Sequence, residues 1–389
     1  MQGGETFLKT ELTSRERIRL TLEHKEADRV PIDLGGSDCT TITEKPYEEL
    51  KKTLGIKKTA RIFSTRFQTV FVDDEVQQLL HSDVRPIAYR PSQRALNITS
   101  KNGEFFDEWG IGYRLSADGL YYDIVSYPLA QATIDDLETY DWPDPYDPKR
   151  VEGVAEEARY WFANSDYALL GPGVSCSLFE QCWYLRGFEQ FLLDLLESPD
   201  FAHALLRKVL DIRLGMYGKF LEQADGRLDL VYVADDISMQ TGPMMSPQTY
   251  REIIKPYHKE YFKFIKENSG AKLFYHCCGN VEPFIEDLIE IGVDALNPVQ
   301  LTAKGMDPAR LKEKYGSRIT FWGGVDTQRL LPKGTPEQVE AETKRLIDIM
   351  SPGGGYVLSA VHNIQADTGV ENILTMLKTG YDYGRYGMK

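Results

Sequence analysis

The chain has 389 residues, of which 42% are hydrophobic and 27% charged, and this composition is typical of a folded globular protein rather than a disordered, collagen-like or disulfide-stapled one. Acidic residues outnumber Lys and Arg by 59 to 45, and the net charge of −14 disfavours nucleic acid as a partner, because such binding needs clustered cations. No apolar run reaches membrane-spanning length and the amino terminus does not resemble a signal peptide, so we expect a cytoplasmic protein with no membrane partner.

Helix and strand signals alternate from the start of the chain. Thr13-Ser-Arg-Glu16 is a capping box that predicts an N-terminal helix. Residues 29–36 predict a strand that ends in a glycine turn. Residues 72–81 predict a second helix, and residues 83–89 predict the next strand. This order indicates repeated βα units.

The middle of the chain departs from that order. Between about residues 104 and 127, aromatic residues alternate with polar ones around a turn at residues 116–119, which predicts an inserted β-hairpin. Tyr121 and Tyr122 in this hairpin are expected either to pack across strands or to serve recognition, as a pocket wall or a contact with a partner. The prolines of residues 139–148 exclude a helix and predict a rigid loop. No domain boundary is needed there, so we expect residues 1–389 to form a single domain.

The remainder alternates regularly and predicts a parallel barrel. The helices are expected at residues 151–162, 188–223, 247–266, 281–291, 308–314, from 335 onward and at 370–381, and the strands at residues 167–170, 230–233, 273–275, 294–296, 319–322 and 356–358. About eight strands with matching helices predict an α/β fold, a (β/α)₈ TIM barrel with an N-terminal helical extension and the inserted hairpin. A doubly wound open sheet is the alternative.

Polar residues follow many of these strands, where a barrel places its active site. We expect substrate contacts from Asp33, Gly173, Asn297, Gln300 and Asp326. Gly173 belongs to a Gly-Pro-Gly turn that could offer amides to an anion but lacks a nucleotide-binding fingerprint.

Three further residues indicate a metal site. His276 and Cys278 follow one strand and His362 follows the last, and together they offer two imidazoles and a thiolate to a zinc ion with an open fourth position. The alternative is that they are buried wall residues, because free cysteine is often buried. The five cysteines are odd in number and scattered, so we expect reduced thiols.

Asp235 and Asp236 are the candidate catalytic residues. Either could act as a general acid, orient the substrate or tune a metal ligand, and either could instead cap a helix. Gly-x-Ser-x-Gly, His-Glu-x-x-His and paired Cys-x-x-Cys motifs are absent, which disfavours common hydrolase and redox classes.

A set of short segments that runs nearly from end to end of the chain is specific when taken together. The segments are Ser14-Arg-Glu-Arg17, Ala27-Asp-Arg-Val-Pro31, Asp107-Glu-Trp-Gly110, Leu185-Arg-Gly-Phe-Glu189, Ala234-Asp-Asp236 with Ser246-Pro247, His276-Cys-Cys-Gly-Asn280, Gly292-Val-Asp-Ala-Leu-Asn-Pro-Val-Gln300, Trp322-Gly-Gly-Val-Asp-Thr327 and Glu371-Asn-Ile373. Through these segments the chain resembles the uroporphyrinogen decarboxylase superfamily and, within it, the corrinoid-dependent methyltransferases. The decarboxylase's arginine-rich segment is not visible after Pro31, which disfavours true uroporphyrinogen decarboxylation.

The resemblance implies a single barrel and a zinc site made of His-x-Cys and a later cysteine. His276 and Cys278 match the first two ligands, and His362 stands where the later cysteine is expected. An imidazole in place of a thiolate makes the ion a stronger Lewis acid, which suits an ether oxygen at least as well as a thiol.

These observations lead to a functional hypothesis. The chain is expected to be a zinc-dependent methyltransferase that exchanges a methyl group between a small methoxyl, methyl-thiol or methylamine compound and the corrinoid (cobalamin) of a partner protein. One alternative is a metal-free decarboxylase or lyase that acts on another carboxylate through Asp33 or Asp235. Another is a catalytically silent subunit that docks a corrinoid protein. A homodimer is compatible with each of these.

Overall fold

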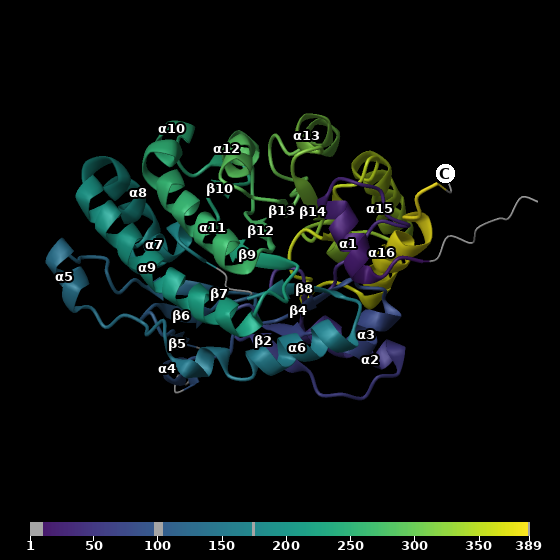
Figure 1. Cartoon of the computed structure of the whole chain (residues 1–389), viewed down its shortest axis with the longest axis horizontal. Coiled ribbons are helices and arrows are strands. Elements are labelled where there is room, and N and C mark those ends of the chain that lie inside the picture. The colour runs from purple at the N-terminus through teal and green to yellow at the C-terminus, as the bar shows by residue number, and fades with distance from the viewer. Residues whose placement is uncertain (1–10, 97–103, 173–175, 388–389) are drawn as a thin grey trace, which may run out of the picture.

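Seven parallel strands curl around a common axis in the computed structural model, which describes residues 11–96, 104–172 and 176–387. In spatial order they are β4 (Val84–Pro86), β8 (Ala168–Gly171), β9 (Leu230–Ala234), β12 (Lys272–His276), β13 (Ala295–Asn297), β14 (Thr320–Val325) and β15 (Tyr356–Ala360). Figure 1 shows the sheet between flanking helices.

An eighth extended segment, residues 30–34, closes the ring. The Leu358 amide of β15 donates to the Pro31 carbonyl at 2.9 Å, and the Asp33 amide donates back to the Leu358 carbonyl at 3.0 Å. On its other side the Asp83 amide, just before β4, donates to the Ile32 carbonyl at 2.8 Å. The predicted strand at residues 29–36 is therefore the first barrel strand, and the predicted (β/α)₈ barrel is confirmed.

Large apolar side chains fill the barrel. The N-terminal helix closes the end of the barrel at which the strands begin. Tyr232, Phe274 and Trp322 belong to one buried cluster inside the ring, as alternate residues of barrel strands should. Helix α1 (Ser14–Leu22) adds Ile18 and Leu22 to the same cluster. The predicted capping box of Thr13 and Glu16 begins this helix. Catalytic groups are therefore expected at the opposite, carboxyl end of the strands.

The remaining helices surround the barrel. They are α2 (Glu44–Leu54), α3 (Asp74–Leu79), α4 (Gln93–Leu96), α5 (Ile134–Thr139), α6 (Val154–Asn164), α7 (Phe179–Arg186), α8 (Phe188–Glu197), α9 (Pro199–Ala224), α10 (Pro247–Thr249), α11 (Lys255–Ser269), α12 (Ile285–Glu290), α13 (Pro308–Tyr315), α14 (Leu330–Lys333), α15 (Pro336–Met350) and α16 (Val370–Tyr383), with 3₁₀ turns η1 (Pro148–Val151) and η3 (Glu282–Phe284).

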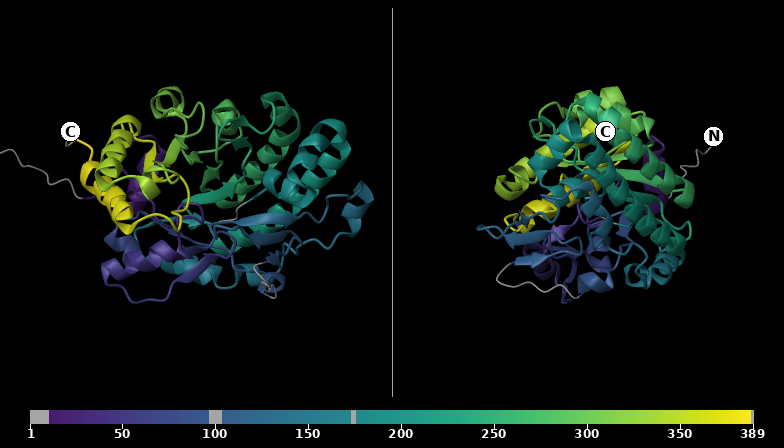
Figure 2. Two further views of the ribbon diagram at one scale, coloured as in Figure 1. Left: turned by 180° about the vertical axis from the view of Figure 1, so that it is seen from behind. Right: turned by 90° about the vertical axis from the view of Figure 1, so that its left-hand side faces the viewer.

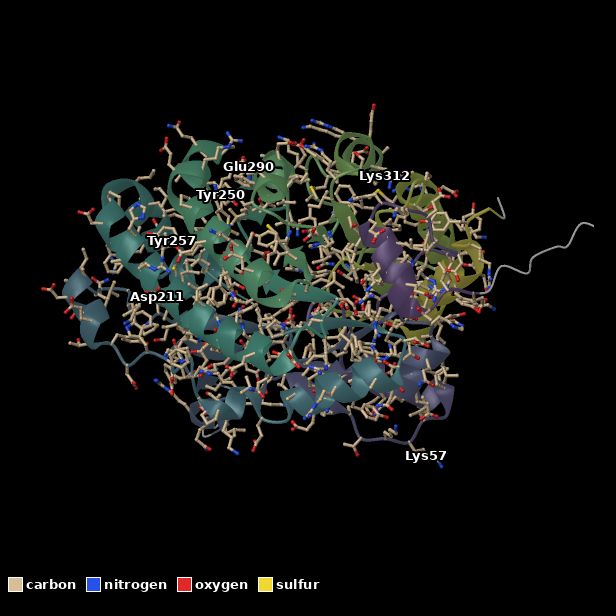
Figure 3. All side chains as sticks on the ribbon, in the orientation of Figure 1. Lys57, Asp211, Tyr250, Tyr257, Glu290 and Lys312 are labelled. Carbon is tan, nitrogen blue, oxygen red and sulfur yellow. The ribbon has the colours of Figure 1, made fainter. Side chains whose placement is uncertain are left out.

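One predicted helix is interrupted. The helix expected at residues 247–266 contains a π-helical turn, η2 (Tyr250–Ile254), between α10 and α11. Tyr250, labelled in Figure 3, is fully buried within that turn. Helix periodicity alone does not reveal this turn. The helices expected through residues 188–223 are α8 and α9, which meet at Ser198, because Pro199 cannot donate a backbone hydrogen bond and instead begins α9.

Three small antiparallel sheets lie outside the barrel. The predicted hairpin has three strands, β5 (Glu104–Phe106), β6 (Gly112–Leu115) and β7 (Tyr122–Ser126), drawn in blue in Figure 1 and seen from behind in Figure 2. The other sheets join β1 (Ile42–Thr43), β3 (Thr69–Phe71) and β2 (Arg61–Ser64), and β10 (Ser238–Met239) with β11 (Gly242–Pro243). The β1–β3–β2 sheet and the β10–β11 sheet were not predicted, because strands of two to four residues carry almost no periodicity. Across the described ranges, no helix has both the length and the apolar character that crossing a bilayer requires.

Candidate active site

A cavity of about 600 Å³ opens at the carboxyl ends of the barrel strands. Its wall includes Asp236 beyond β9, Cys278 beyond β12, Gln300 beyond β13 and His362 beyond β15. Tyr121, from the turn between β6 and β7, forms part of the rim. Polar groups from several successive strands thus share one concave site, which is the usual arrangement of a barrel enzyme.

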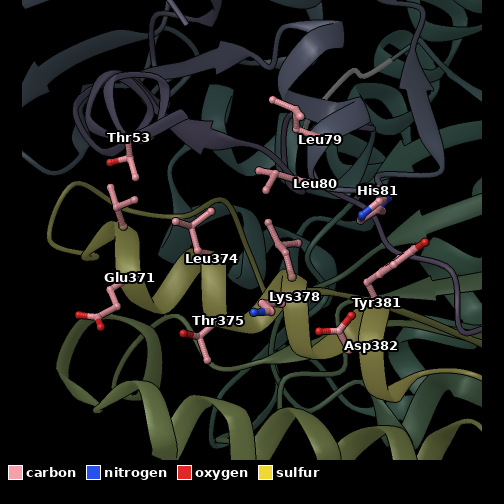
Figure 4. Close-up of a pocket in the computed structure, with 12 residues that line it drawn as sticks. Thr53, Leu79, Leu80, His81, Glu371, Leu374, Thr375, Lys378, Tyr381 and Asp382 are labelled. Carbon is pink, nitrogen blue, oxygen red and sulfur yellow. The ribbon is translucent and has the colours of Figure 1, made fainter. Parts of the chain in front are cut away.

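A larger groove of about 790 Å³ lies on the outer wall of the barrel, where α16 faces α2 and the end of α3. Figure 4 shows its Leu79, Leu80 and Leu374 side chains. Neither of the two groups of metal-ligand side chains found among the described residues lies in this groove. The smaller cavity is lined by Asp236, Cys278 and His362 and is therefore the better candidate for the active site.

His276 is oriented by Asn297, one barrel strand away. The Nδ1 atom of His276 lies 2.5 Å from the Asn297 Oδ1 atom. The Asn297 Nδ2 group donates to the Trp322 carbonyl at 3.2 Å, so the amide oxygen must face the imidazole, and Nδ1 must carry the proton. The free Nε2 atom lies 3.4 Å from the Cys278 sulfur. This is the hydrogen-bonding pattern of a metal-ligating histidine.

His362 has a similar partner. Its Nδ1 atom lies 2.7 Å from the Asn363 Oδ1 atom, which leaves Nε2 available as a ligand. The two imidazole centroids are 5.5 Å apart, with a 65° angle between the rings. Burial lowers the pKa of both His276 and His362, so both imidazoles are neutral near pH 7, the form that binds metals.

The potential ligand atoms form two overlapping groups. In one, atoms of Asp236, His276 and Cys278 lie within 4.8 Å of one another, and in the other, atoms of Cys39, His276 and His362 do so. His276 belongs to both groups, whereas Cys278 and His362 belong to different ones. Of the predicted trio, His276 thus groups with Cys278 on one hand and with His362 on the other, but the three do not form a single group. Cys39, which was not predicted, belongs to the group with the two imidazoles.

The donor set fits a zinc ion. It offers neutral imidazole nitrogens and a thiol sulfur, which are the usual zinc ligands. Burial raises the pKa of the Cys278 thiol, and the nearby Asp236 carboxylate raises it further, so a bound cation would be needed to hold the sulfur as a thiolate. Cys277 points elsewhere, because its sulfur accepts the Ile237 amide at 3.5 Å.

Asp235 and Asp236 play different parts despite being adjacent. The Asp235 side chain is fully buried and accepts the Phe179 and Glu180 amides at 2.8 and 2.7 Å, and its Oδ2 atom lies 2.7 Å from His258 Nε2. It caps the start of α7 and does not line the cavity. Its predicted catalytic role therefore has no support in the geometry, and the capping alternative describes it better.

Asp236 does line the cavity. Its Oδ1 atom accepts the Cys278 amide at 2.6 Å, which fixes the carboxyl beside the thiol. Burial raises the pKa of Asp236 to about 6, with the negative charge of Asp235 adding to the effect. A carboxyl group with a pKa near neutrality, held in a cavity, is suited to proton transfer.

Four of the residues predicted to bind substrate lie within the described ranges, and one of these four lines the cavity as expected. Gln300 does so, with its Oε1 atom accepting the Gly279 amide at 2.7 Å. Asp33 is buried and accepts the Gly36 amide and the Trp322 indole N–H at 2.8 and 2.9 Å, so it holds the first loop. Asn297 supports His276 instead of facing substrate.

Asp326 and Gly173 complete the predicted set. The Asp326 carboxylate accepts the amides of Gln328, Arg329 and Leu330 at 2.9 to 3.0 Å and thereby stabilises the start of α14, outside the cavity wall. Gly173 lies outside the described residues.

The structure adds residues that sequence reasoning missed. Asn363, Gln365 and Asp367, beyond β15, line the cavity together with Gln328. Both alternatives for the hairpin tyrosines are realised, since Tyr121 lines the cavity while Tyr122 packs edge-on against Phe105 at 5.2 Å. The sequence signal for the loop residues was their position after a strand, but they lie several residues beyond its end.

Comparisons with known proteins agree with this architecture. Residues 122–383 match the family model described as uroporphyrinogen decarboxylase (URO-D). The chain is 26% identical over 168 residues to a methylated-thiol–coenzyme M methyltransferase of Methanosarcina mazei, covering 42% of this chain and 41% of that protein. It is 26% identical over 191 residues to a uroporphyrinogen decarboxylase of Aromatoleum aromaticum, covering 48% of this chain and 49% of that protein.

The chain spans about half the length of the curated relatives it matches. A solved structure of a methyltransferase from Methanosarcina mazei superposes with a TM-score of 0.67 over 96% of this chain and 99% of that one, at 18% identity, which is a likeness in fold. Because the family model matches more than half of the sequence, the chain belongs to the uroporphyrinogen decarboxylase family.

Proposed function

We propose that the protein is a zinc-dependent methyltransferase that exchanges a methyl group between a small methylated compound and the corrinoid of a partner protein. The observation that carries this proposal is the 3.4 Å separation of His276 Nε2 and Cys278 Sγ beside the cavity. Zinc bonds of about 2.0 Å to nitrogen and about 2.3 Å to sulfur place two tetrahedral ligands about 3.5 Å apart. The pair is thus already spaced to share an ion.

His362 would supply a further nitrogen, since its ring centroid lies 5.5 Å from that of His276. The hydrogen bonds to Asn297 and Asn363 hold the two rings so that each keeps its Nε2 atom free. When bound, zinc supplies Lewis-acid polarisation of the heteroatom that carries or receives the methyl group. The methyl transfer itself would use the cobalt of the partner's corrinoid.

Asp236 would handle the proton that accompanies the exchange. When a methyl group leaves the substrate, its heteroatom takes up a proton, which the Asp236 carboxyl can give, and in the reverse direction the carboxylate can accept it. A pKa of about 6 makes both protonation states accessible near neutral pH. Asp235 would act only by fixing the start of α7, which packs behind the site.

The cavity favours a small, uncharged or cationic substrate. Its volume of about 600 Å³ suits a small molecule, and its described lining carries Asp236 and Asp367 but no Lys or Arg. A compound with several carboxylates would be repelled and would find no cationic partner. This supports methyl exchange over a decarboxylase or lyase that acts on a polycarboxylate. The Methanosarcina mazei relative is a methyltransferase of methylated thiols by name, which points to the same class of substrate.

The hairpin offers a place for the partner. Leu120 and Tyr121 reach the cavity, while Tyr121 and Val125 are 50% and 43% exposed. A corrinoid must come within bonding distance of the methyl group, so the partner is expected to dock over this rim and displace the hairpin tip. Exposed apolar side chains at the mouth fit such a transient contact.

The test combines metal analysis with a methylation assay. Protein purified under reducing conditions is mixed with reduced corrinoid protein and methoxylated aromatics, methylamines or methyl-thiols, and methyl-cobalt formation is followed by absorbance. We expect stoichiometric zinc and substrate-dependent methylation, both lost in Cys278→Ala and kept in the matched control Cys182→Ala, whose thiol is buried in α7 away from the cavity. Zinc-free protein whose activity resists chelators would support the metal-free lyase instead.

A further inference from the structure

Cys39 lies beyond the first barrel strand, in a loop that had no predicted role. It is 5% exposed and belongs to the apolar cluster inside the barrel. Its sulfur lies 3.0 Å from the Tyr232 hydroxyl. On this evidence alone Cys39 would be an ordinary buried cysteine.

The two nearby imidazoles of His276 and His362 indicate a different role for Cys39. Ligand atoms of Cys39, His276 and His362 all lie within 4.8 Å of one another, and the Cys278 sulfur lies 3.4 Å from the His276 Nε2 atom. Tetrahedral zinc ligands are about 3.5 Å apart, so the ligand atoms of Cys39, His276 and His362 lie within about 1.3 Å of the separations that a shared ion requires. Cys278 belongs to the other group and would join them by a movement of its side chain. Two thiols thus flank one imidazole whose orientation is already fixed by Asn297.

The loop that carries Cys39 is held firmly. Asp33 accepts the Gly36 amide at 2.8 Å and the Trp322 indole N–H at 2.9 Å, which ties the loop to β14. The Gly35 amide donates to the Thr40 carbonyl at 2.8 Å, closing the turn just after Cys39. Gly35 has a φ of +91°, and a Cβ atom there would lie 2.8 Å from Val72, so the turn requires glycine. Asp33 thus positions a sulfur instead of binding substrate.

We propose that Cys39 is a zinc ligand, which makes the site a two-thiolate, two-imidazole set of Cys39, His276, Cys278 and His362. This assignment rests on the proposed function. Position 362 carries a histidine where the resemblance implies a cysteine. In this assignment the second sulfur comes instead from Cys39, in the loop after the first barrel strand. Two thiolates neutralise the ion's charge and reduce its Lewis acidity, so a soft thiol or thioether substrate is favoured over an ether oxygen, and it binds by displacing one ligand or as a fifth.

Asp236 is the competing ligand, because it too lies within 4.8 Å of His276 and Cys278. Its Oδ1 atom already accepts the Cys278 amide, and the carboxyl lines the cavity, where substrate binds. Cys39 instead belongs to the apolar cluster inside the barrel and is not part of the cavity lining, although its sulfur lies near both imidazoles. We therefore place Cys39 in the ligand set and leave Asp236 to the substrate.

The test counts sulfur atoms around the metal. X-ray absorption of the zinc-loaded wild-type protein is expected to show two sulfur and two nitrogen neighbours. In protein measured with cobalt(II) in excess, so that weakened sites are also filled, the sulfur-to-cobalt charge-transfer band should fall by half in Cys39→Ser and in Cys278→Ser and vanish in the double variant. Cys182→Ser is the matched control and should leave the band unchanged. Loss of a ligand should weaken zinc binding at least as much as loss of an outer hydrogen bond, about 10-fold or more.

The outcomes separate the two proposals. Wild-type protein with one sulfur and three nitrogen or oxygen neighbours would overturn the role of Cys39 while leaving the zinc enzyme intact, and an unchanged cobalt band in Cys39→Ser would do the same. Wild-type protein that binds neither metal would overturn the proposed function itself. If Cys39→Ser fails to fold, the wild-type sulfur count still decides the question.

Discussion

Replacing Asn297 by alanine tests how the site is organised without touching a ligand. The Asn297 oxygen is the acceptor for His276 Nδ1, and both residues are buried, so water does not readily replace it. Without this partner the imidazole is free to rotate or adopt the other tautomer. Loss of such an outer hydrogen bond usually weakens metal binding 10- to 100-fold, which corresponds to about 1.4–2.7 kcal/mol. The cost of a buried, unpaired N–H group, about 1–3 kcal/mol, is of the same size.

The measurement is the zinc dissociation constant, obtained by competition with a chromogenic chelator, alongside thermal unfolding of the metal-free protein. Asn372→Ala is the matched control, because Asn372 is also buried and donates to the Leu331 and Gly334 carbonyls at 2.9 and 2.8 Å, far from the site in α16. Both variants should lose stability, and only Asn297→Ala should lose zinc affinity. Equal zinc affinity in the two variants would refute the role given to Asn297.

Three further changes probe the rim, the hairpin and the core. Tyr121→Ala should raise KM several-fold and leave zinc content unchanged, since Tyr121 lines the cavity but is no ligand; a fall in bound zinc would contradict this. Burial raises the pKa of Asp107 from 3.8 to about 6, so the folded state holds this proton more tightly than the unfolded chain does. Stability should therefore fall by up to about 2 kcal/mol as pH rises from about 4 to about 6, and Asp107→Asn should flatten that part of the pH–stability curve, which urea unfolding would show. Phe274→Ala should cost about 3–5 kcal/mol of unfolding free energy, because the ring is fully buried and packs edge-on against Trp322; a loss below about 1 kcal/mol would mean that the barrel interior is not packed as described.

Local signals in the sequence were sufficient to predict the fold. The capping box at Thr13 begins a helix, as predicted, and the helix predicted from residue 335 onward begins with a second capping box. In the helix predicted at residues 281–291, the side chains on one face, Val281, Phe284, Ile285 and Leu288, are fully buried. Closure of the ring depends on residues 30–34, whose strand was predicted from its composition. The β1–β3–β2 sheet depends on pairing between segments too short to show a period, so no local pattern identifies it.

The site was only partly predictable, for a geometric reason. The sequence shows which residues lie at the end of a strand. It does not show which of two neighbouring side chains faces the cavity, because successive side chains point in opposite directions. Asp236 therefore faces the cavity while Asp235 turns back to cap α7, and the two look alike in the sequence. Asn297 follows a strand yet supports His276 from behind. Cys39 lies five residues beyond its strand, and the fold of the intervening turn decides where its sulfur lies.

The most direct test is the metal content of protein purified under reducing conditions, measured together with its activity before and after chelation. We expect one zinc ion per chain in the wild type, none retained in Cys278→Ala, and methyl transfer that disappears with the metal and returns when zinc is restored. Wild-type protein that carries no zinc and keeps its full activity in the presence of a chelator would contradict the claim that His276, Cys278 and His362 bind a catalytic ion.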